Sequence, residues 1–401
     1  MGLRHFLVWV ALVQAAPDCD VTVYVYPSTQ NSALDRNDIS SSEPRMHDLF
    51  SQSPCAVTDP SRASFFFVPV YPTAIAHGGG DGVSLERAYT YTTKVHSDLL
   101  QTSIYYSRRN GTDHIFVSAH DIGSCLFPPY MASSSIFLQH FGDTEHPSTS
   151  VLSYLNAGHQ PRSSALLSRA SMLPCYNETK DILIPSFFGE RNTVALNHFV
   201  TKKTASAANR PIDIFFRGTQ HASHPEYSNG VRQHLPELFA NSPAQNIRIS
   251  FDLHTLYDTK AYWEELTASK FCLSPPGWVH WSPRTFQAIS AHCVPIIIQN
   301  TTVRLPFQNV LDYPSFSIVT NDENIVVDPL SYILAVNLTL AQMQENLKVV
   351  WRHFTYGGPG MVVSATSQQQ QLLGVCLESG GSPILNHVLS ELALRFTNNI
   401  I

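Results

Sequence analysis

The chain has 401 residues, more than one ordinary hydrophobic core holds, so two domains are expected. A hydrophobic fraction of 43% with only 14% charged residues excludes a disordered chain. The net charge is −6 and no long run of Lys or Arg occurs. Nucleic acid is therefore not an expected partner, because phosphate binding needs a concentrated basic surface.

Residues 1–17 have the pattern of a signal peptide. Arg4 precedes an apolar run at 6–13, and the small residues Ala15 and Ala16 follow it. The run is too short for a membrane-spanning helix, which needs about 20 residues; a short signal-anchor and a buried first element are the alternatives. No later segment is apolar enough to span a bilayer. We therefore expect a soluble lumenal chain in the Golgi or ER, or a secreted one.

Potential glycosylation sites and cysteines fit this location. Four Asn-x-Thr sequons occur, at Asn110, Asn177, Asn300 and Asn337. Seven cysteines show neither a Cys-x-x-Cys pair nor zinc-site spacing: Cys19, Cys55, Cys125, Cys175, Cys272, Cys293 and Cys376. In an oxidising lumen they would form up to three disulfides and leave one thiol over. We expect disulfides rather than a metal site.

The first half alternates short β-rich runs with longer amphipathic stretches, which indicates an α/β architecture. A helix is predicted at 85–106, and strands are predicted at 21–26, 65–70, 114–119 and 181–184. The glycine-rich stretch 77–82 lacks the Lys-Ser/Thr of a phosphate loop and the spacing of a dinucleotide fingerprint. We interpret it as a loop.

A polar, unpatterned stretch at 201–210 marks a domain boundary. Beyond it we predict strands at 212–216, 247–251, 271–273 and 294–298, and helices at 225–240, 262–269, 282–291, 330–354 and 383–396. Such βαβ units imply a parallel sheet with right-handed crossovers. The expected domains are 18–205 and 206–380, followed by a C-terminal helix at 381–401.

Three segments stand where an open α/β sheet binds ligands, beyond the carboxyl ends of its strands. His120-Asp121 follows one predicted strand, Arg217-Gly218 follows a second, and a turn containing Gly277 follows a third. Polar, charged or glycine residues at these places predict a binding site along the strand ends.

The helix predicted at 282–291 carries a further binding signal. Ser282 suits its N-cap and Pro283 its first position. Arg284 in the first turn opposes the helix dipole, and an anion bound at the helix start would remove that conflict. Gln287 lies on the same helix face as Arg284. A surface ion pair is the alternative for Arg284.

Motifs in a consistent order extend over about residues 20 to 320. In the C-terminal half they are Ser269 to Gly277, Ser282-x-Arg284, Cys293 to Ile298, Leu305-Pro-Phe and Leu311-Asp-Tyr. Weaker ones in the N-terminal half are Val23 to Tyr26, Thr58-Asp-Pro, Phe65 to Pro69, His114 to Asp121, Asp181 to Pro185 and Phe215 to Gly218. Together these motifs closely resemble exostosin-type glycosyltransferases (glycosyltransferase family 47).

The resemblance implies a GT-B fold, in which two Rossmann-like domains with parallel sheets face each other across a cleft. It implies transfer of a sugar from a nucleotide donor, usually UDP-linked, to a glycan or glycoprotein acceptor with inversion. It implies no cofactor and no catalytic metal. Homo- or hetero-oligomers with related transferases are the expected assemblies.

Without a metal, positive side chains must hold the diphosphate, and Arg217 and Arg284 are the candidates. Ser282 and its neighbouring N–H groups would assist, and the turn at Gly277 would cover the base or ribose. For the general base Asp121 is preferred, followed by His120. A structural histidine and a loop-capping carboxylate are the alternatives for this pair.

Two positions depart from the family pattern: Gln287 replaces an acidic residue that commonly holds the ribose, and His292 replaces a glycine. The second hypothesis is therefore an inactive lumenal glycan-binding or chaperone-like subunit of a transferase complex. Cys272 and Cys293 would lie on neighbouring strands, within disulfide range if they are level. Two buried thiols are the alternative.

Overall fold

The computed structural model describes residues 19–28, 41–78, 83–157, 163–187, 210–240, 242, 244–251, 259–321, 326–335, 339–356 and 382–397. The expected signal peptide, the boundary at 201–209 and most of the glycine-rich stretch lie outside the described residues, as do Asn337 and Cys376. No helix in these described ranges has the length and apolar content needed to cross a bilayer.

The first sheet has six parallel strands in the order β2-β1-β3-β4-β5-β6. They are β1 (Val23–Val25), β2 (Ala56–Val57), β3 (Phe65–Phe67), β4 (His114–Ser118), β5 (Ile136–Gln139) and β6 (Ile182–Leu183). Its helices are α1 (Ser42–Ser51), α2 (Pro72–His77), α3 (Leu85–Thr102), α4 (Ile104–Arg108), α5 (Pro129–Ser134), α6 (Thr149–Asn156) and α7 (Ser164–Met172). Both faces are covered: Ile115 and Val117 enter one apolar cluster and Phe116 the other, as strand alternation requires.

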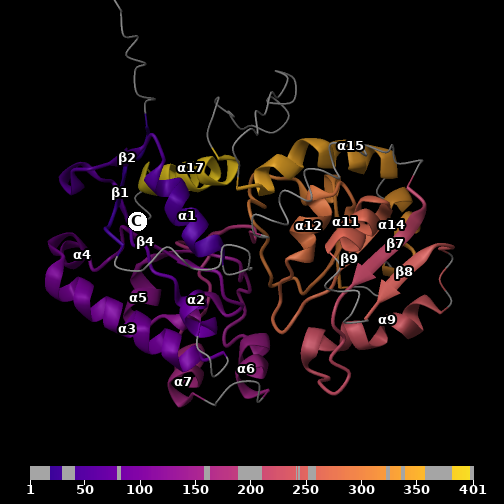
Figure 1. Ribbon diagram of the computed structural model, residues 1–401, viewed down its shortest axis with the longest axis horizontal. Helices are drawn as coiled ribbons and strands as arrows, with labels where there is room; N and C mark the ends of the chain where they lie inside the picture. Colours follow the sequence, from indigo (N-terminus) through magenta and orange to yellow (C-terminus); the bar gives the residue numbers. More distant parts are fainter. Residues whose placement is uncertain are drawn as a thin grey trace, which may run out of the picture.

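The second sheet has five parallel strands in the order β11-β10-β9-β7-β8. They are β7 (Ile212–Arg217), β8 (Ile247–Ser250), β9 (Ser269–Ser274), β10 (Val294–Ile298) and β11 (Ile318–Thr320). Its helices are α9 (Val231–Phe239), α11 (Thr259–Thr267), α12 (Arg284–Ser290), α14 (Pro329–Ala335) and α15 (Leu340–Val350). The strand order reverses between β7 and β9, which is the topological switch point of a doubly wound sheet. Two Rossmann-like parallel α/β layers thus confirm the predicted fold class (Figure 1).

The C-terminal helix α17 (Pro383–Thr397) returns to the first sheet and lies beside α1 (Figure 1). Ile384 and Val388 share an apolar cluster with Met46 and Phe50 of α1. At its far end the Arg395 guanidinium donates to the Asp181 carbonyl oxygen at 3.1 Å. The last helix therefore completes the core of the first half.

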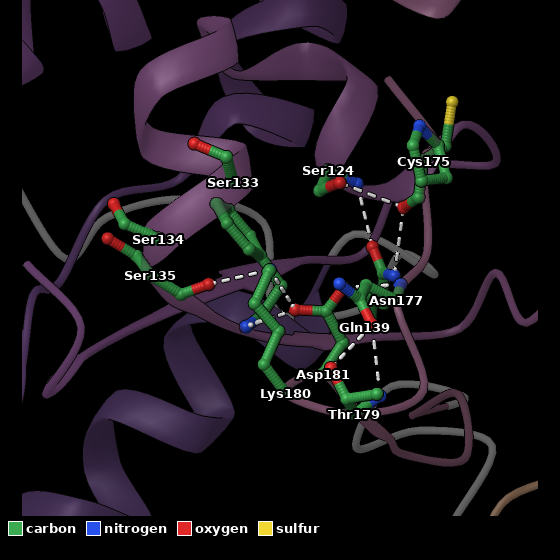
Figure 2. Close-up of polar contacts among 12 residues, drawn as sticks. Ser124, Ser133, Ser134, Ser135, Gln139, Cys175, Asn177, Thr179, Lys180 and Asp181 are labelled. Carbon is green, nitrogen blue, oxygen red and sulfur yellow. Dashed lines mark hydrogen bonds and ion pairs between the residues drawn. The ribbon is translucent and has the colours of Figure 1, made fainter. Parts of the chain in front are cut away.

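Three disulfides occur among the described residues: Cys19–Cys55, Cys125–Cys175 and Cys272–Cys293. The last joins β9 to the residue before β10, with Cα atoms 5.9 Å apart. The second anchors the loop that leads to β6. Figure 2 shows the hydrogen bonds that hold this loop, in which the Cys175 carbonyl accepts from Ser124 Oγ (2.8 Å) and Gln139 Nε2 (3.0 Å).

Three predicted helices are interrupted. The one at 85–106 breaks at Ser103, whose Oγ accepts the Tyr106 N–H at 3.2 Å and so caps α4. The one at 225–240 begins only after Gly230, where a left-handed φ of 80° ends a short 3₁₀ turn. The stretch 330–354 divides into α14, α15 and a 3₁₀ turn, and Thr339 forms a capping box with Gln342 at the start of α15. The short strands β2, β5 and β11 were not predicted.

Candidate active site

The carboxyl ends of the two sheets meet through paired backbone segments. Thr144, beyond β5, donates its N–H to Thr302 O at 3.0 Å, and Arg304, beyond β10, donates to Gly142 O at 2.8 Å. A Cβ on Gly142 would lie 2.5 Å from the Arg304 carbonyl oxygen, so this approach requires glycine. The strand ends of both halves therefore border one region.

The loop after β9 enters the first half. Val279 is buried in an apolar cluster formed mainly by the first sheet and its helices, and Trp278 and Trp281 pack against the same cluster. Trp281 lies 5.1 Å, centroid to centroid, from the His140 ring beyond β5. Aromatic side chains from one half thus cover strand ends of the other.

A buried polar chain reinforces this contact. The Asp143 carboxylate accepts from His280 Nδ1 at 3.0 Å and from Ser148 Oγ at 2.9 Å. Asn229 Nδ2 lies 2.8 Å from His280 Nε2. Burial raises the pKa of Asp143, but the hydrogen bonds to its carboxylate lower the pKa by more. The hydrogen bond from His280 contributes most, and the pKa of Asp143 lies below its ordinary value. A neutral imidazole that donates from Nδ1 and accepts at Nε2 satisfies both contacts. Sequence reasoning missed Asp143 and His280.

Asp121 lies at the carboxyl end of β4, beside the Trp281 side chain. The carboxyl is only partly exposed. Burial raises its pKa to about 6, and the Trp281 contact partly offsets this rise. Burial, and secondarily the charge of Asp121, raise the pKa of Tyr154, so a second aromatic residue lies in the surroundings of Asp121. The result is a carboxylate that takes up a proton near neutral pH.

His120 has a different environment. It is 4% exposed, and its Nδ1 accepts the Ile122 N–H at 3.3 Å. Burial, and secondarily the neighbouring His77, lower its pKa to about 3. A ring that stays neutral and accepts from the backbone fits a structural histidine better than a proton acceptor.

Glu43, in the first turn of α1, supports the same strand end and was also missed. Its Oε1 accepts the N–H of Ala119 at 3.1 Å and the N–H and hydroxyl of Thr73 at 3.1 and 2.5 Å. The side chain is fully buried, and burial raises its pKa to about 8. Glu43 thus fixes the backbone directly before His120 and Asp121.

The second sheet places its cations at the switch point between β7 and β9. Phe215 pairs with Cys272, so Arg217 and Ser274 end their strands at the same edge. Arg284 Nε donates to the Arg217 carbonyl oxygen at 2.9 Å, and its guanidinium lies 5.4 Å from the Phe216 ring centroid. The guanidinium of Arg217 forms an ion pair with Glu265 of α11.

Gly218 makes this arrangement possible. A Cβ there would lie 2.7 Å from Arg284 Nη2 and 2.8 Å from Phe216 Cζ. The glycine is therefore needed for close approach of the Arg284 side chain to the end of β7.

A third arginine, Arg232 of α9, lies at the same edge and was not predicted. It is 2% exposed and donates to the carbonyls of Thr219 (3.1 Å) and Pro275 (3.3 Å), the residues just beyond β7 and β9. Its guanidinium lies 4.8 Å from the Tyr227 ring centroid. Burial, with the nearby charge of Arg284, lowers its pKa to about 9, which leaves it cationic at neutral pH.

Gln287 extends the cluster along α12. Its Oε1 accepts the Tyr262 hydroxyl of α11 at 2.6 Å. Burial raises the pKa of Tyr262, and the charges of Arg284 and Arg217 counteract this rise, so all four side chains belong to one group. The uncharged amide therefore still has a defined position.

The structure corrects the expected N-cap of α12 and shows how Gly277 is placed. The N-cap of α12 is Pro283, not Ser282; the buried Ser282 Oγ accepts the Arg284 N–H at 3.4 Å. The helix begins later because the preceding residues form the turn that holds Trp281. Gly277 accepts the Ser228 N–H at 2.8 Å, and a Cβ on it would meet no atom closer than 4.0 Å. It is a turn residue with free space around it.

A small cavity lies between the loop after β9, the start of α12 and the segment after β10, and none of Arg217, Arg232 and Arg284 lines it. About 20 Å³ in volume, it is lined by residues that include His140, Ser274, Trp281, Ser282 and Arg304. This space holds about one water molecule. Among the described residues, no cluster of His, Cys, Asp or Glu has the arrangement of a metal site.

Comparison with known proteins places the chain in a family. A family model of the exostosin GT47 domain matches residues 18–335. A probable glucuronoxylan glucuronosyltransferase of Arabidopsis thaliana is 26% identical over 384 residues, 88% of this chain and 76% of that protein. A probable beta-1,4-xylosyltransferase of the same plant is 26% identical over 324 residues, 76% of this chain and 69% of that protein. A probable glucuronosyltransferase of Oryza sativa subsp. japonica is 27% identical over 324 residues, which are 76% of this chain and 68% of that protein. The chain belongs to the exostosin GT47 family.

Proposed function

We propose that the chain is a glycosyltransferase that moves a sugar from a UDP-linked donor to a glycan acceptor with inversion. The cation cluster at the switch point of the second sheet carries this proposal. Arg217, Arg232 and Arg284 gather where doubly wound sheets bind nucleotides. The names of the relatives suggest that UDP-glucuronate and UDP-xylose are the first donors to test.

The proposed reaction is a single displacement. An acceptor hydroxyl gives its proton to the Asp121 carboxylate while its oxygen attacks the anomeric carbon. The bond between that carbon and the diphosphate oxygen breaks, and both electrons leave with UDP. Because attack and departure occur on opposite faces of the sugar, the configuration inverts.

The residues of the two edges divide this work. Arg284 and Arg217 would stabilise the charge of the leaving diphosphate, with Arg232 behind them adding positive potential. Asp121 would act as the base, because its pKa of about 6 matches proton uptake near neutral pH. Since arginines supply the charge, we propose that activity persists in EDTA.

Thermal shift with a panel of UDP-sugars tests the donor site. UDP-glucuronate, UDP-xylose or UDP itself should raise the melting temperature of the parent chain, because a ligand that binds the folded state stabilises it. Arg284→Ala should remove this shift, while Arg62→Ala, a change at an exposed arginine elsewhere, should keep it. An Arg284→Ala variant that bound UDP as tightly as the parent would overturn the placement of the diphosphate.

The alternative is an inactive glycan-binding subunit, in line with the replacement of an acidic residue by Gln287. Turnover separates the two. The enzyme releases UDP in proportion to acceptor consumed, whereas the inactive subunit would bind glycan without releasing UDP from any donor.

We further propose passage through the secretory pathway, with a Golgi location. The described sequons suit glycosylation: Asn110 and Asn300 are exposed, and Asn177 Oδ1 accepts the Thr179 N–H at 3.0 Å in a surface turn. Chain expressed in a eukaryotic secretory host should lose mass on treatment with an N-glycosidase. An unchanged mass would contradict this proposal.

A further inference from the structure

A second cavity, of about 330 Å³, lies where three distant segments of the chain meet. The loop before β6 forms one wall, the segment after β10 the second, and α17 the third. Arg304 and Leu305 line both this cavity and the small one beside Ser282. The two spaces therefore share a wall, and neither Arg217 nor Arg284 lines either of them.

The wall formed by the loop before β6 is held in place. The Asp181 carboxylate accepts the N–H groups of Asn177 (2.9 Å) and Phe137 (3.1 Å) and the ammonium of Lys180 (2.6 Å). Figure 2 shows the contacts of Asp181 with Asn177 and Lys180, and the Cys125–Cys175 disulfide fixes the start of the loop. A wall fixed in this way forms a site that a ligand need not reorganise.

Several polar groups at this cavity have unused hydrogen-bonding capacity. The Tyr176 hydroxyl has no hydrogen-bond partner among the described residues, although the side chain is 7% exposed. Arg395 uses Nη2 to bind Asp181 O, while its buried Nη1 has no partner in the part of the chain that the structure describes. Gln308 accepts the Leu305 N–H with Oε1 at 2.8 Å, which leaves its amide N–H groups for a ligand.

The charges that line the cavity pair off. Arg304 Nε lies 2.9 Å from Glu178, and Arg395 Nη2 lies 3.6 Å from Glu391. Asp181 is paired with Lys180. With no excess charge, the cavity does not select an anion. It offers donors and acceptors together, which suits hydroxyl groups, since each of them both donates and accepts.

Apolar side chains complete the lining. Leu183, Leu305 and Phe307 border the same space as the polar groups. A pyranose ring combines polar hydroxyl edges with apolar C–H faces, so it matches such a mixed lining. The volume falls in the range of small-ligand pockets, which is about 300–1,000 Å³.

We propose that this cavity binds uncharged sugar units of a glycan chain, as an accessory site beside the transfer site. This inference rests on the proposed function for the identity of the glycan. A chain held there lies against Arg304 and Leu305, and the same two residues border the small cavity that Ser274 and Ser282 line. The site would retain a long acceptor without contacting the reacting atoms.

Hydrogen exchange of the full chain with saturating xylotetraose locates the sugar. We expect several-fold slower exchange in 176–183, 304–309 and α17. Asn309→Trp, at an exposed position that lines the cavity, should fill the space and abolish this protection. Gln101→Trp on α3, exposed but remote in the fold, is the matched control and should keep it. Tyr176→Phe should weaken binding about two- to tenfold, the usual effect of one hydrogen bond.

Three outcomes would overturn the site: no protection of these segments, protection that Asn309→Trp retains, or equal protection by inorganic phosphate. Equal protection by inorganic phosphate would show that the cavity is an anion site. Protection by UDP near Arg217 and Arg284 is measured in the same samples. Its absence would refute the proposed function, whereas the response to xylotetraose decides the accessory site separately.

Discussion

The two sheets share one topology, yet their facing edges carry opposite chemistry. The edge of the second sheet gathers Arg217, Arg232 and Arg284, each fixed by a backbone carbonyl or a carboxylate. The edge of the first sheet presents a partly exposed carboxylate, Asp121, and a neutral His120. In the proposed function, these equivalent scaffolds supply an anion-binding side and a proton-accepting side. Side chains at the strand ends and on the neighbouring helices α9 and α12, rather than the sheet itself, decide the difference.

The largest effect should come from removing the proton acceptor. Asp121→Asn keeps the shape of the side chain but cannot take a proton, so kcat should fall about 10²- to 10⁴-fold. UDP binding, measured by thermal shift, should stay unchanged because the donor lies on the other edge. A kcat within threefold of the parent would show that another group is the base.

The pH profile sharpens the same assignment. Because the pKa of Asp121 is raised to about 6, lowering the pH through 6 protonates the base. We expect kcat/KM to fall about tenfold per pH unit below this value and to level off above it. His120→Gln should keep this inflection, since burial lowers the pKa of His120 to about 3. Loss of the inflection in His120→Gln would reverse the roles of the two residues.

A smaller effect is expected at the donor edge from Gly218→Ala. The new methyl group would lie 2.7 Å from Arg284 Nη2 and displace the guanidinium. UDP affinity should fall roughly three- to tenfold, which corresponds to one weakened charged hydrogen bond. Gly277→Ala is the control, because the added Cβ meets no atom within about 4.0 Å. Equal UDP affinities in both variants would mean that Arg284 does not bind the donor.

The smallest change is expected for Gln287→Glu. A carboxylate beside Arg284 could still accept the Tyr262 hydroxyl and would hold ribose hydroxyls more strongly. UDP-sugar binding should tighten about two- to fivefold in isothermal titration. Tyr262→Phe removes the hydrogen bond that positions the Gln287 amide but adds no charge. It therefore separates the effect of the side chain's charge from the effect of its position. Weaker binding by Gln287→Glu would indicate that a neutral group is preferred here.

The parallel α/β architecture could be predicted because strand runs and turn residues are local signals. Arg217, Gly218 and Asp121 were found by one rule, that ligands bind beyond strand ends. Arg232 escaped this rule because it lies within α9 and reaches the edge by its long side chain. Asp143 was missed because β5 before it was not recognised, and His280 because its partner is 137 residues away.

Helix boundaries were the least predictable part. Apolar periodicity continues through Ser103, but the hydrogen bond from the Tyr106 N–H to its Oγ starts a new helix there. The periodicity also continues through 225–230, but left-handed φ angles in this stretch delay the start of α9. The start of α12 was misplaced for a similar reason. Ser282 is a good N-cap residue in isolation, yet packing of Trp281 against the first half sets the path of the chain before it.

The return of α17 to the first sheet has a consequence for biosynthesis. Ile384, Val388 and Leu392 share an apolar cluster with Met46 and Phe50 of α1, which are made more than three hundred positions earlier. While the ribosome is still working on the second half, that surface stays uncovered, and such surfaces aggregate or recruit chaperones. The face of α1 that packs against α17 therefore reaches its final environment only after the last helix has been made.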